Sequence, residues 1–307
     1  FFLGMSVELF EEIPTDFARM RPSIEYYEVI MRLEGHRRSD NVDDRRGSGG
    51  NFGGGKGGII GLIIVLVGAY YGVDLTGLVD AGGLNQATES RQSSSEEIHL
   101  EDLSRTVLAS TEDSWQGYFQ RMGKRYANPT LVLYSGYTST ACGTGQAAMG
   151  PFYCPNDNQV YLDLSFYQEM KNKLGAAGDS AFAYVIAHEV GHHVQNLLGI
   201  LPQVNRLRQK ADSKTANQLS VKLELQADCF AGVWARSAVK SGLFELGDEE
   251  KAFKAAEAVG DDRLQKRSQG YVVPDSFTHG TSAQRLSWFR KGLQSGDPAR
   301  CDTFNND

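Results

Sequence analysis

The stretch "AHEVGHHVQN", residues 187–196, places three histidines and one glutamate within ten positions. His188 and His192 are four residues apart, so on a helix they lie on one face, where two imidazole rings can reach one metal ion. Glu189 projects at a neighbouring angle, which suits a general base for an attacking water better than a third ligand. The alternative is a pair of core histidines satisfied by local hydrogen bonds. A third ligand is needed to decide between them.

A second motif offers that ligand. In "ELQAD", residues 224–228, Glu224 and Asp228 are again four apart and share one helical face. Glu224 completes a His₂Glu zinc site with an open fourth position, as catalytic zinc requires. Asp228 can accept the remaining ring N–H of a ligating histidine. The alternative is a solvated helix face, but the surrounding residues are mostly apolar: Leu223, Leu225, Ala227, Cys229, Phe230 and Trp234.

These two motifs carry a resemblance. "HEVGH" followed by "ELQAD" is similar to the H-E-x-x-H plus E-x-x-A-D pairing of gluzincin zinc peptidases. The chain more closely resembles the bacterial membrane-anchored "putative neutral zinc metallopeptidase" family, from Met31 to the C-terminus. The matching segments are "RRSDNVDDRR", "GPFYCP", "VYLDLSFY", "HEVGHHVQ", "ELQADCFAGVWA" and "HGTSAQR". The resemblance implies a zincin-like fold and a zinc peptidase that uses Zn²⁺.

The segment "THGTSAQRLSWF" resembles the T-H-P-x-x-x-x-R segment of membrane gluzincins, with Gly280 in place of proline. His279 would be catalytic if it donates to the oxyanion that develops when water attacks a carbonyl. Arg285 would orient an acidic residue of the site. The alternative is a helix N-terminus with a surface histidine and a structural arginine. His193 is turned about 100° from His192 on a helix, so we expect it to be structural or to support a ligand.

An uncharged stretch precedes these motifs. Residues 57–73, "GGIIGLIIVLVGAYYGV", suit a single N-terminal transmembrane helix; a buried core helix is the alternative. The glycine-rich run before it contains Gly50–Lys56, which matches G-x-x-x-x-G-K, but Gly57 stands where a phosphate loop has Ser or Thr. Basic residues before the stretch predict a cytoplasmic N-terminus: Arg32, Arg37, Arg38, Arg45, Arg46 and Lys56. The catalytic domain would then face the periplasm or the outside of a bacterial inner membrane, on a single-pass anchor.

The predicted organisation has five parts. Residues 1–30 fit no element of this plan, and we interpret them as an upstream extension from a wrong start site before Met31. A cytoplasmic basic, glycine-rich segment (31–56), the anchor (57–73) and a serine-rich tether (74–97) follow. Residues 98–307 form the metallopeptidase domain.

The four cysteines all follow the apolar stretch. An even number in an oxidising compartment indicates two disulfides, with three possible pairings. We favour Cys142 with Cys154, which closes a short loop, and Cys229 with Cys301. There is no C-x-x-C spacing of the kind that a thiolate zinc site uses.

Periodicity predicts an α+β, helix-dominated domain with a small sheet. The expected helices cover about 98–125, from Asp179 as N-cap to Gly199, 204–240 and 248–259, and the expected strands are 130–134 and 159–164. The strand at 159–164 is either an edge strand to which a substrate adds or, as we favour, an ordinary core strand.

The leading hypothesis is a membrane-anchored zinc endopeptidase with Glu189 as general base and acid, acting on a peptide or protein substrate in the cell envelope. One alternative is a non-catalytic zinc-containing envelope scaffold or binding protein. Another is an amidase that acts on cell-wall peptides. A net charge of −7 argues against nucleic acid as a partner. The sequence defines neither a cleavage preference nor an oligomeric state.

Overall fold

The computed structural model describes residues 31–46, 94–147, 150–245 and 247–305. The expected extension (1–30), the expected anchor (57–73) and the tether up to residue 93 lie outside the described residues. In the part of the chain that the structure describes, no helix is both long enough and apolar enough to cross a membrane. The fold is helix-dominated with a small sheet, which confirms the α+β prediction for the described residues.

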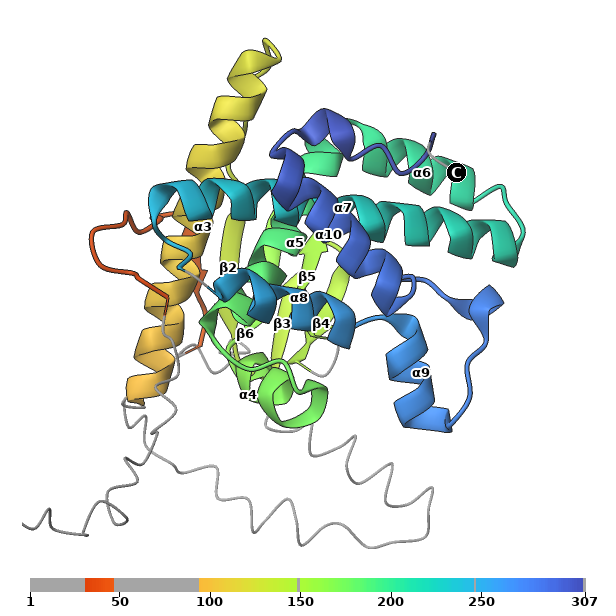
Figure 1. The fold of residues 1–307 in the computed structure, drawn as a ribbon, viewed down its shortest axis with the longest axis horizontal. Coiled ribbons are helices and arrows are strands. Elements are labelled where there is room, and N and C mark those ends of the chain that lie inside the picture. Colours follow the sequence, from red (N-terminus) through yellow and green to blue (C-terminus); the bar gives the residue numbers. More distant parts are fainter. Residues whose placement is uncertain (1–30, 47–93, 148–149, 246, 306–307) are drawn as a thin grey trace, which may run out of the picture.

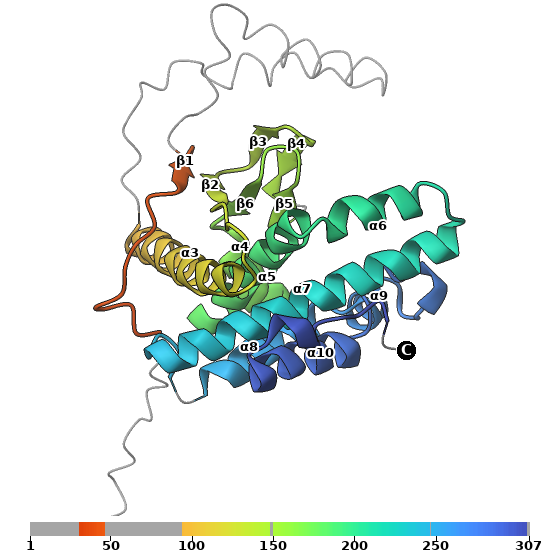
Figure 2. The same cartoon turned by 90° about the horizontal axis from the view of Figure 1, so that it is seen from above.

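The elements form three layers (Figures 1 and 2). A four-stranded sheet lies on one side, α3 (Ser95–Arg121) and α5 (Asp179–Leu197) form the middle, and the third layer holds α7 (Ser213–Ser241), α8 (Asp248–Ala258) and α10 (Ser282–Ser295). Because α5 lies between the sheet and the third layer, nearly all of its side chains are buried. The histidine-rich helix is therefore the centre of the core.

The four-stranded sheet has the order β1-β2-β6-β5, and β3 and β4 form a separate antiparallel pair. The strands are β1 (Val42–Asp44), β2 (Thr130–Tyr134), β3 (Tyr137–Thr140), β4 (Gly143–Gln146), β5 (Phe152–Cys154) and β6 (Gln159–Asp163). β1, β2 and β6 are parallel, whereas β5 is antiparallel to β6. The core-strand interpretation of 159–164 is confirmed, because β6 lies between β2 and β5. The edge-strand interpretation is wrong, and β5 is the edge strand on that side.

Helix termini differ from the prediction where capping residues decide them. α3 starts before residue 98 because Ser94 and Glu97 form a capping box. The predicted helix 204–240 is two helices, α6 (Ile200–Arg208) and α7, since Asp212 accepts a hydrogen bond from the Thr215 N–H and starts a new helix. The remaining helical elements are short: α4 (Phe166–Glu169), a π-turn (Met170–Leu174), α9 (Asp261–Gln269) and two 3₁₀ turns (Pro274–Ser276 and Pro298–Arg300).

Asp179 is the first residue of α5 rather than its N-cap, which is Gly178. Its buried carboxylate instead lies 2.9 Å from His99 Nε2 and accepts a hydrogen bond from the backbone N–H of Met31 at 3.3 Å. The residue therefore joins three segments that are distant in the sequence.

Glycines allow the helices of the core to approach closely. A Cβ added at Gly191 of α5 would lie 3.0 Å from the carbonyl oxygen of Ala227 in α7. A Cβ at Gly292 of α10 would lie 2.0 Å from the carbonyl oxygen of Cys229. Side chains at these positions would force the helices apart, and with them the side chains of the candidate site.

Residues 31–46 are part of the folded domain, which corrects the predicted boundary at residue 98. β1 pairs with β2. Next to it, the buried carboxylate of Glu112 in α3 accepts hydrogen bonds from Arg37, Ser39 and Asn41, each at 2.7 Å. A carboxylate taken out of water needs such partners. The segment therefore completes the domain instead of standing apart from it.

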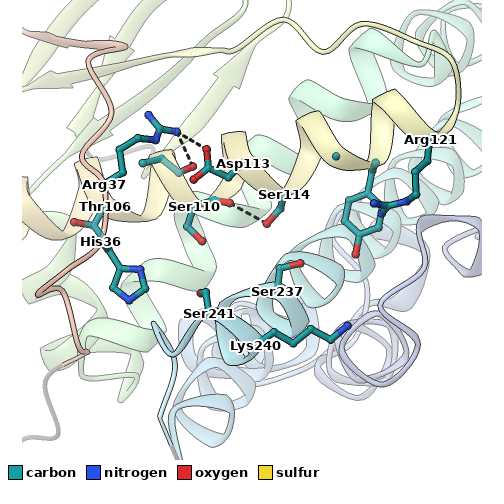
Figure 3. A pocket seen from close by; sticks show the side chains of 13 residues that line it. His36, Arg37, Thr106, Ser110, Asp113, Ser114, Arg121, Ser237, Lys240 and Ser241 are labelled. Carbon is teal, nitrogen blue, oxygen red and sulfur yellow. Dashed lines mark hydrogen bonds and ion pairs between the residues drawn. The ribbon is translucent and has the colours of Figure 1, made fainter.

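A polar pocket of about 400 Å³ lies between this segment and the end of α7 (Figure 3). His36 and Arg37 line one side, and Ser237 and Lys240 line the other. Arg37 also forms an ion pair with Asp113 at 2.8 Å. The expected metal ligands are not among the residues that line this pocket.

The predicted disulfide pairing is confirmed. Cys142 is bonded to Cys154, and Cys229 is bonded to Cys301. The first bond ties the β3–β4 turn to edge strand β5, and the second ties the C-terminal tail to α7. Each covalent link restricts the unfolded chain and is worth about 2–4 kcal/mol in typical cases.

Candidate metal centre

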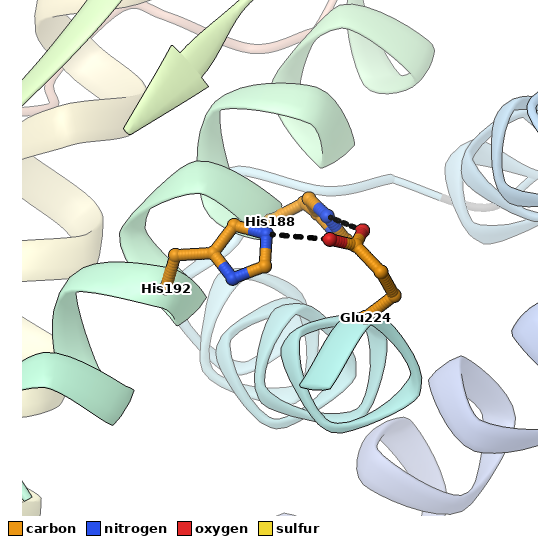
Figure 4. A group of neighbouring side chains, drawn as sticks. All are labelled: His188, His192 and Glu224. Carbon is orange, nitrogen blue, oxygen red and sulfur yellow. Dashed lines mark hydrogen bonds and ion pairs between the residues drawn. The ribbon is translucent and has the colours of Figure 1, made fainter. Parts of the chain in front are cut away.

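His188, His192 and Glu224 converge where α5 crosses α7 (Figure 4). His188 Nε2 lies 3.1 Å from Glu224 Oε2, and His192 Nε2 lies 3.5 Å from Glu224 Oε1. Ligand atoms around a tetrahedral zinc ion with bonds near 2.1 Å are separated by about 3.4 Å. The two separations from Glu224 are close to this value and all three ligand atoms lie within 4.8 Å of one another, so the side chains have the chemistry and the approximate spacing for one zinc ion.

Asp228 orients His188. Its Oδ1 lies 2.9 Å from His188 Nδ1, while Arg285 donates to both of its oxygens at 2.8 and 2.9 Å. Burial alone would raise the pKa of Asp228, but the charges of Arg285 and His188 outweigh it and lower that pKa. An ionised Asp228 accepts the Nδ1 hydrogen and leaves Nε2 of His188 directed at Glu224. These supporting roles of Asp228 and Arg285 are the ones predicted from the sequence.

The metal-free cluster is an ion-pair network. Burial opposes protonation of His188, yet Asp228 and Glu224 together raise its pKa to about 10. Burial also opposes ionisation of Glu224, but His192 and His188 hold its pKa well below the usual range. A bound cation would stabilise the same carboxylate and displace the proton from His188.

Glu189 follows His188 in α5 and is buried, with 8% of its surface exposed. Burial raises the pKa of this carboxyl, and the positive charges of His192 and His188 act in the opposite direction. Glu189 is outside the group of converging ligand atoms. A buried carboxylate beside the ligands, but not among them, suits a proton acceptor.

His279 lies in the loop before α10, and its interaction with Asp261 had no counterpart in the sequence analysis. Asp261 Oδ1 is 3.2 Å from His279 Nδ1, and Oδ2 accepts from the backbone N–H groups of Thr278, His279 and Gly280 at 2.6–3.0 Å. The hydrogen bond from His279 to the Asp261 carboxylate raises the pKa of His279, as does the charge of Glu224. About half of the His279 side chain is exposed, so it is a hydrogen-bond donor accessible from solvent.

His193 has a structural role, as expected from its angle on the helix. Its Nε2 donates to the Ala127 carbonyl at 2.7 Å, and its Nδ1 lies 3.0 Å from the Tyr153 hydroxyl. Burial lowers the pKa of His193 to about 4. The neutral ring thus connects α5 to the edge strand β5.

Three residues of the site were missed from the sequence. Tyr184 donates its hydroxyl hydrogen to Asp228, and Gln195 Oε1 lies 2.9 Å from His192 Nδ1. Helical spacing from the histidines could have indicated both residues. No helical spacing connects Asp261 to the site, because the chain turns between Asp261 and His279.

Two histidines and a glutamate on adjoining helices, with a buried glutamate between the histidines, form a candidate metal site with the H-E-x-x-H pattern. The family described as "Putative neutral zinc metallopeptidase" matches residues 31–304, and the chain belongs to that family. The family supports the zinc peptidase class.

The chain is similar to curated bacterial proteins. It is 58% identical over 283 residues to "Uncharacterized protein YpfJ" of Escherichia coli (strain K12), covering 89% of this chain and 99% of that protein. It is 43% identical over 209 residues to "Uncharacterized protein Mb2605" of Mycobacterium bovis, covering 64% of this chain and 70% of that protein. No solved structure matches.

Proposed function

We propose that the protein is a zincin-like zinc endopeptidase in which His188, His192 and Glu224 hold the ion and Glu189 is the general base. The observation that carries this proposal is the convergence of three ligand atoms at the α5–α7 crossing beside a buried carboxylate. Membership of the zinc metallopeptidase family supports the same reaction class.

When bound, Zn²⁺ supplies a Lewis acid that lowers the pKa of water and polarises a carbonyl oxygen. Glu189 takes the proton from the attacking water and gives it to the leaving amine. His279, held by Asp261, donates a hydrogen bond to the carbonyl oxygen as negative charge develops on it. Asp228 keeps the His188 ring in place throughout.

We propose that the peptide substrate adds to edge strand β5. β5 pairs on only one side with a described strand, so its outer edge offers backbone hydrogen bonds to an extended chain. Tyr153 of β5 contacts His193, which is next to the ligand His192. The disulfide from Cys154 to Cys142 fixes this strand relative to the β3–β4 turn.

We place the protein in the cell envelope, attached to the membrane through residues 57–73. Two disulfides support an oxidising compartment for the domain. One crossing by residues 57–73 would put residues 31–46 and the domain on opposite sides of the bilayer. The pairing of β1 with β2 instead supports an arrangement with both on the same side.

Cysteine labelling distinguishes these arrangements. A membrane-impermeant maleimide is applied to intact spheroplasts that carry Asp40→Cys or Tyr137→Cys, both at exposed positions. Labelling of both supports the same-side arrangement. Labelling of Tyr137→Cys alone supports the single crossing that the basic residues predicted.

The full-length chain tests the reaction directly. Bound zinc is measured by elemental analysis, and cleavage is measured with an unbiased peptide library, for the wild type and Glu189→Gln. The proposal expects zinc in both proteins and cleavage only in the wild type. Zinc in both with cleavage in neither would favour a scaffold. Activity on cell-wall peptides alone would favour an amidase.

A further inference from the structure

We propose that Gln195 is a positioning residue of the metal centre. Its amide determines which ring nitrogen of His192 carries hydrogen, and it ties that ring to the helix that bears Glu224. This inference rests on the proposed zinc site. It assigns a function to a fully buried polar side chain that takes no part in the proposed reaction.

The amide of Gln195 bridges the two ligand-bearing helices. It follows His192 by three residues on α5, and its Oε1 lies 2.9 Å from His192 Nδ1. Its Nε2 donates to the carbonyl oxygen of Leu223 on α7 at 2.8 Å. Leu223 immediately precedes Glu224, so a single side chain connects one ligand to the backbone next to another.

The orientation of this amide follows from its partners. The Leu223 carbonyl is only an acceptor, so the NH₂ group of Gln195 must face it and Oε1 must face His192. Oε1 is also only an acceptor, so a hydrogen bond with His192 requires a hydrogen on Nδ1. The unprotonated Nε2 of His192 is then directed at Glu224, where a metal ion would bind.

A second amide supports the first. Gln226 Nε2 donates to the Cys301 carbonyl at 2.9 Å, which leaves Gln226 Oε1 to accept from Gln195 Nε2 at 3.1 Å. Cys301 is held to Cys229 of α7 by a disulfide. The backbone carbonyls of Leu223 and Cys301 thus fix the direction of each hydrogen bond in the series that ends at His192.

The two histidines are oriented by different chemistry. His188 is held by a buried carboxylate that an arginine neutralises, whereas His192 is held by a neutral amide. An amide at this position orients the ring without adding a second buried charge, which would need its own counter-ion. Loss of an outer partner of a ligating histidine typically reduces metal affinity about 10–100-fold.

The tautomer of His192 is the first measurement. The metal-free full-length chain is labelled with ¹⁵N-histidine and studied at a pH where the ring is neutral; His192→Gln assigns the resonance among six histidines. We expect hydrogen on Nδ1 in the wild type and a shift towards Nε2 in Gln195→Met. Hydrogen on Nε2 in the wild type, or an unchanged spectrum in Gln195→Met, would overturn the proposal.

Zinc affinity, measured by competition with a chromophoric chelator, is the second measurement. Gln195→Met is expected to bind zinc about 10–100-fold more weakly. Gln226→Met is expected to lose less, because the Leu223 carbonyl still orients Gln195.

Gln195→Glu separates positioning from packing. Its carboxylate still accepts the Nδ1 hydrogen of His192, so zinc affinity should stay closer to the wild type than in Gln195→Met. The new carboxylate would face two hydrogen-bond acceptors, the Leu223 carbonyl and Gln226 Oε1. Gln195→Glu should therefore lower the thermal unfolding temperature more than Gln195→Met does. If zinc affinity instead falls in proportion to the unfolding temperature across the variants, Gln195 contributes only to packing and does not position His192. If the wild type binds no zinc, the proposed function fails, while the tautomer still decides the role of Gln195.

Discussion

Asp261 holds His279 through both of its carboxylate oxygens, one facing the ring and the other accepting from the backbone N–H of the same residue. The charge of Glu224 also raises the pKa of His279. Asp261 therefore controls both the place and the protonation of the proposed oxyanion donor.

We predict that Asp261→Asn moves the alkaline limb of the kcat/KM profile to lower pH. The hydrogen bond that the His279 ring donates to Asp261 raises the pKa of His279 above its ordinary value, so the charged donor persists to higher pH in the wild type. Without the carboxylate, the proton is lost earlier as pH rises. The measurement is peptide cleavage across neutral and alkaline pH.

Asp262→Asn is the matched control, because Asp262 bonds Ser282 of the same region rather than His279. Identical alkaline limbs in the two variants would contradict the role of Asp261. His279→Ala is expected to reduce kcat/KM by about 10²–10³-fold, as loss of an oxyanion donor does.

The N-terminal segment gives a second prediction. A chain that starts at residue 94 lacks Arg37, Ser39 and Asn41, so the Glu112 carboxylate loses these hydrogen-bond partners. A hydrogen bond to a charged group typically contributes about 1.5–3 kcal/mol. We expect a lower unfolding temperature, restored by adding a synthetic peptide of residues 31–46. A peptide with Arg37→Ala and Asn41→Ala should restore less, and equal restoration by both peptides would argue against the Glu112 contacts.

These contacts also explain why the segment was not predicted to be part of the domain. Its arginines look like the cytoplasmic flank of a membrane span, since the positive-inside rule counts charges without their partners. In the folded chain three of them pair with acidic side chains of α3: Arg37 with Glu112, Arg38 with Asp102 and Arg46 with Glu101. Ion pairs between segments distant in sequence leave no local periodicity to detect.

The candidate ligands could be identified from the sequence because helical periodicity places His188 with His192, and Glu224 with Asp228, on one face of a helix. Helix caps and strand order were harder to predict from the sequence. β1 and β5 have three residues each, too few to show an alternating pattern. The long helix predicted for 204–240 divides at Asp212, where one side-chain cap starts α7. Local chemistry at single residues set these boundaries.

The Arg285–Asp228 pair gives a third prediction. Both side chains are almost fully buried, and Arg285 and His188 together keep Asp228 ionised. Arg285→Met should lower the free energy of unfolding by up to about 3–5 kcal/mol, because it removes one of the two cations that stabilise the buried Asp228 carboxylate. Arg206→Met, on an exposed position of α6, is the control and should change it by less than about 0.5 kcal/mol. Denaturant unfolding measures the free energy of unfolding of both variants. Equal losses in the two would mean that the buried Arg285–Asp228 ion pair does not stabilise the fold.

His193 gives the last prediction, on acid stability. Burial lowers its pKa from 6.5 to about 4 in the folded chain, so between these values the unfolded chain binds the extra proton. Stability from His193 is therefore complete above about pH 6.5 and is lost as pH falls towards 4, up to about 3 kcal/mol.

The measurement is denaturant unfolding of the metal-free protein in this pH window, for the wild type and His193→Gln. A glutamine side chain can still donate and accept hydrogen bonds but cannot take up the proton, so the variant should show a smaller decline between pH 6.5 and 4. The pKa of His188, about 10, places its contribution in a different window: its stabilising effect is complete below pH 6.5 and is lost as pH rises towards 10. A variant that declines as steeply as the wild type on the acid side would show that other groups, not His193, make the fold sensitive to acid.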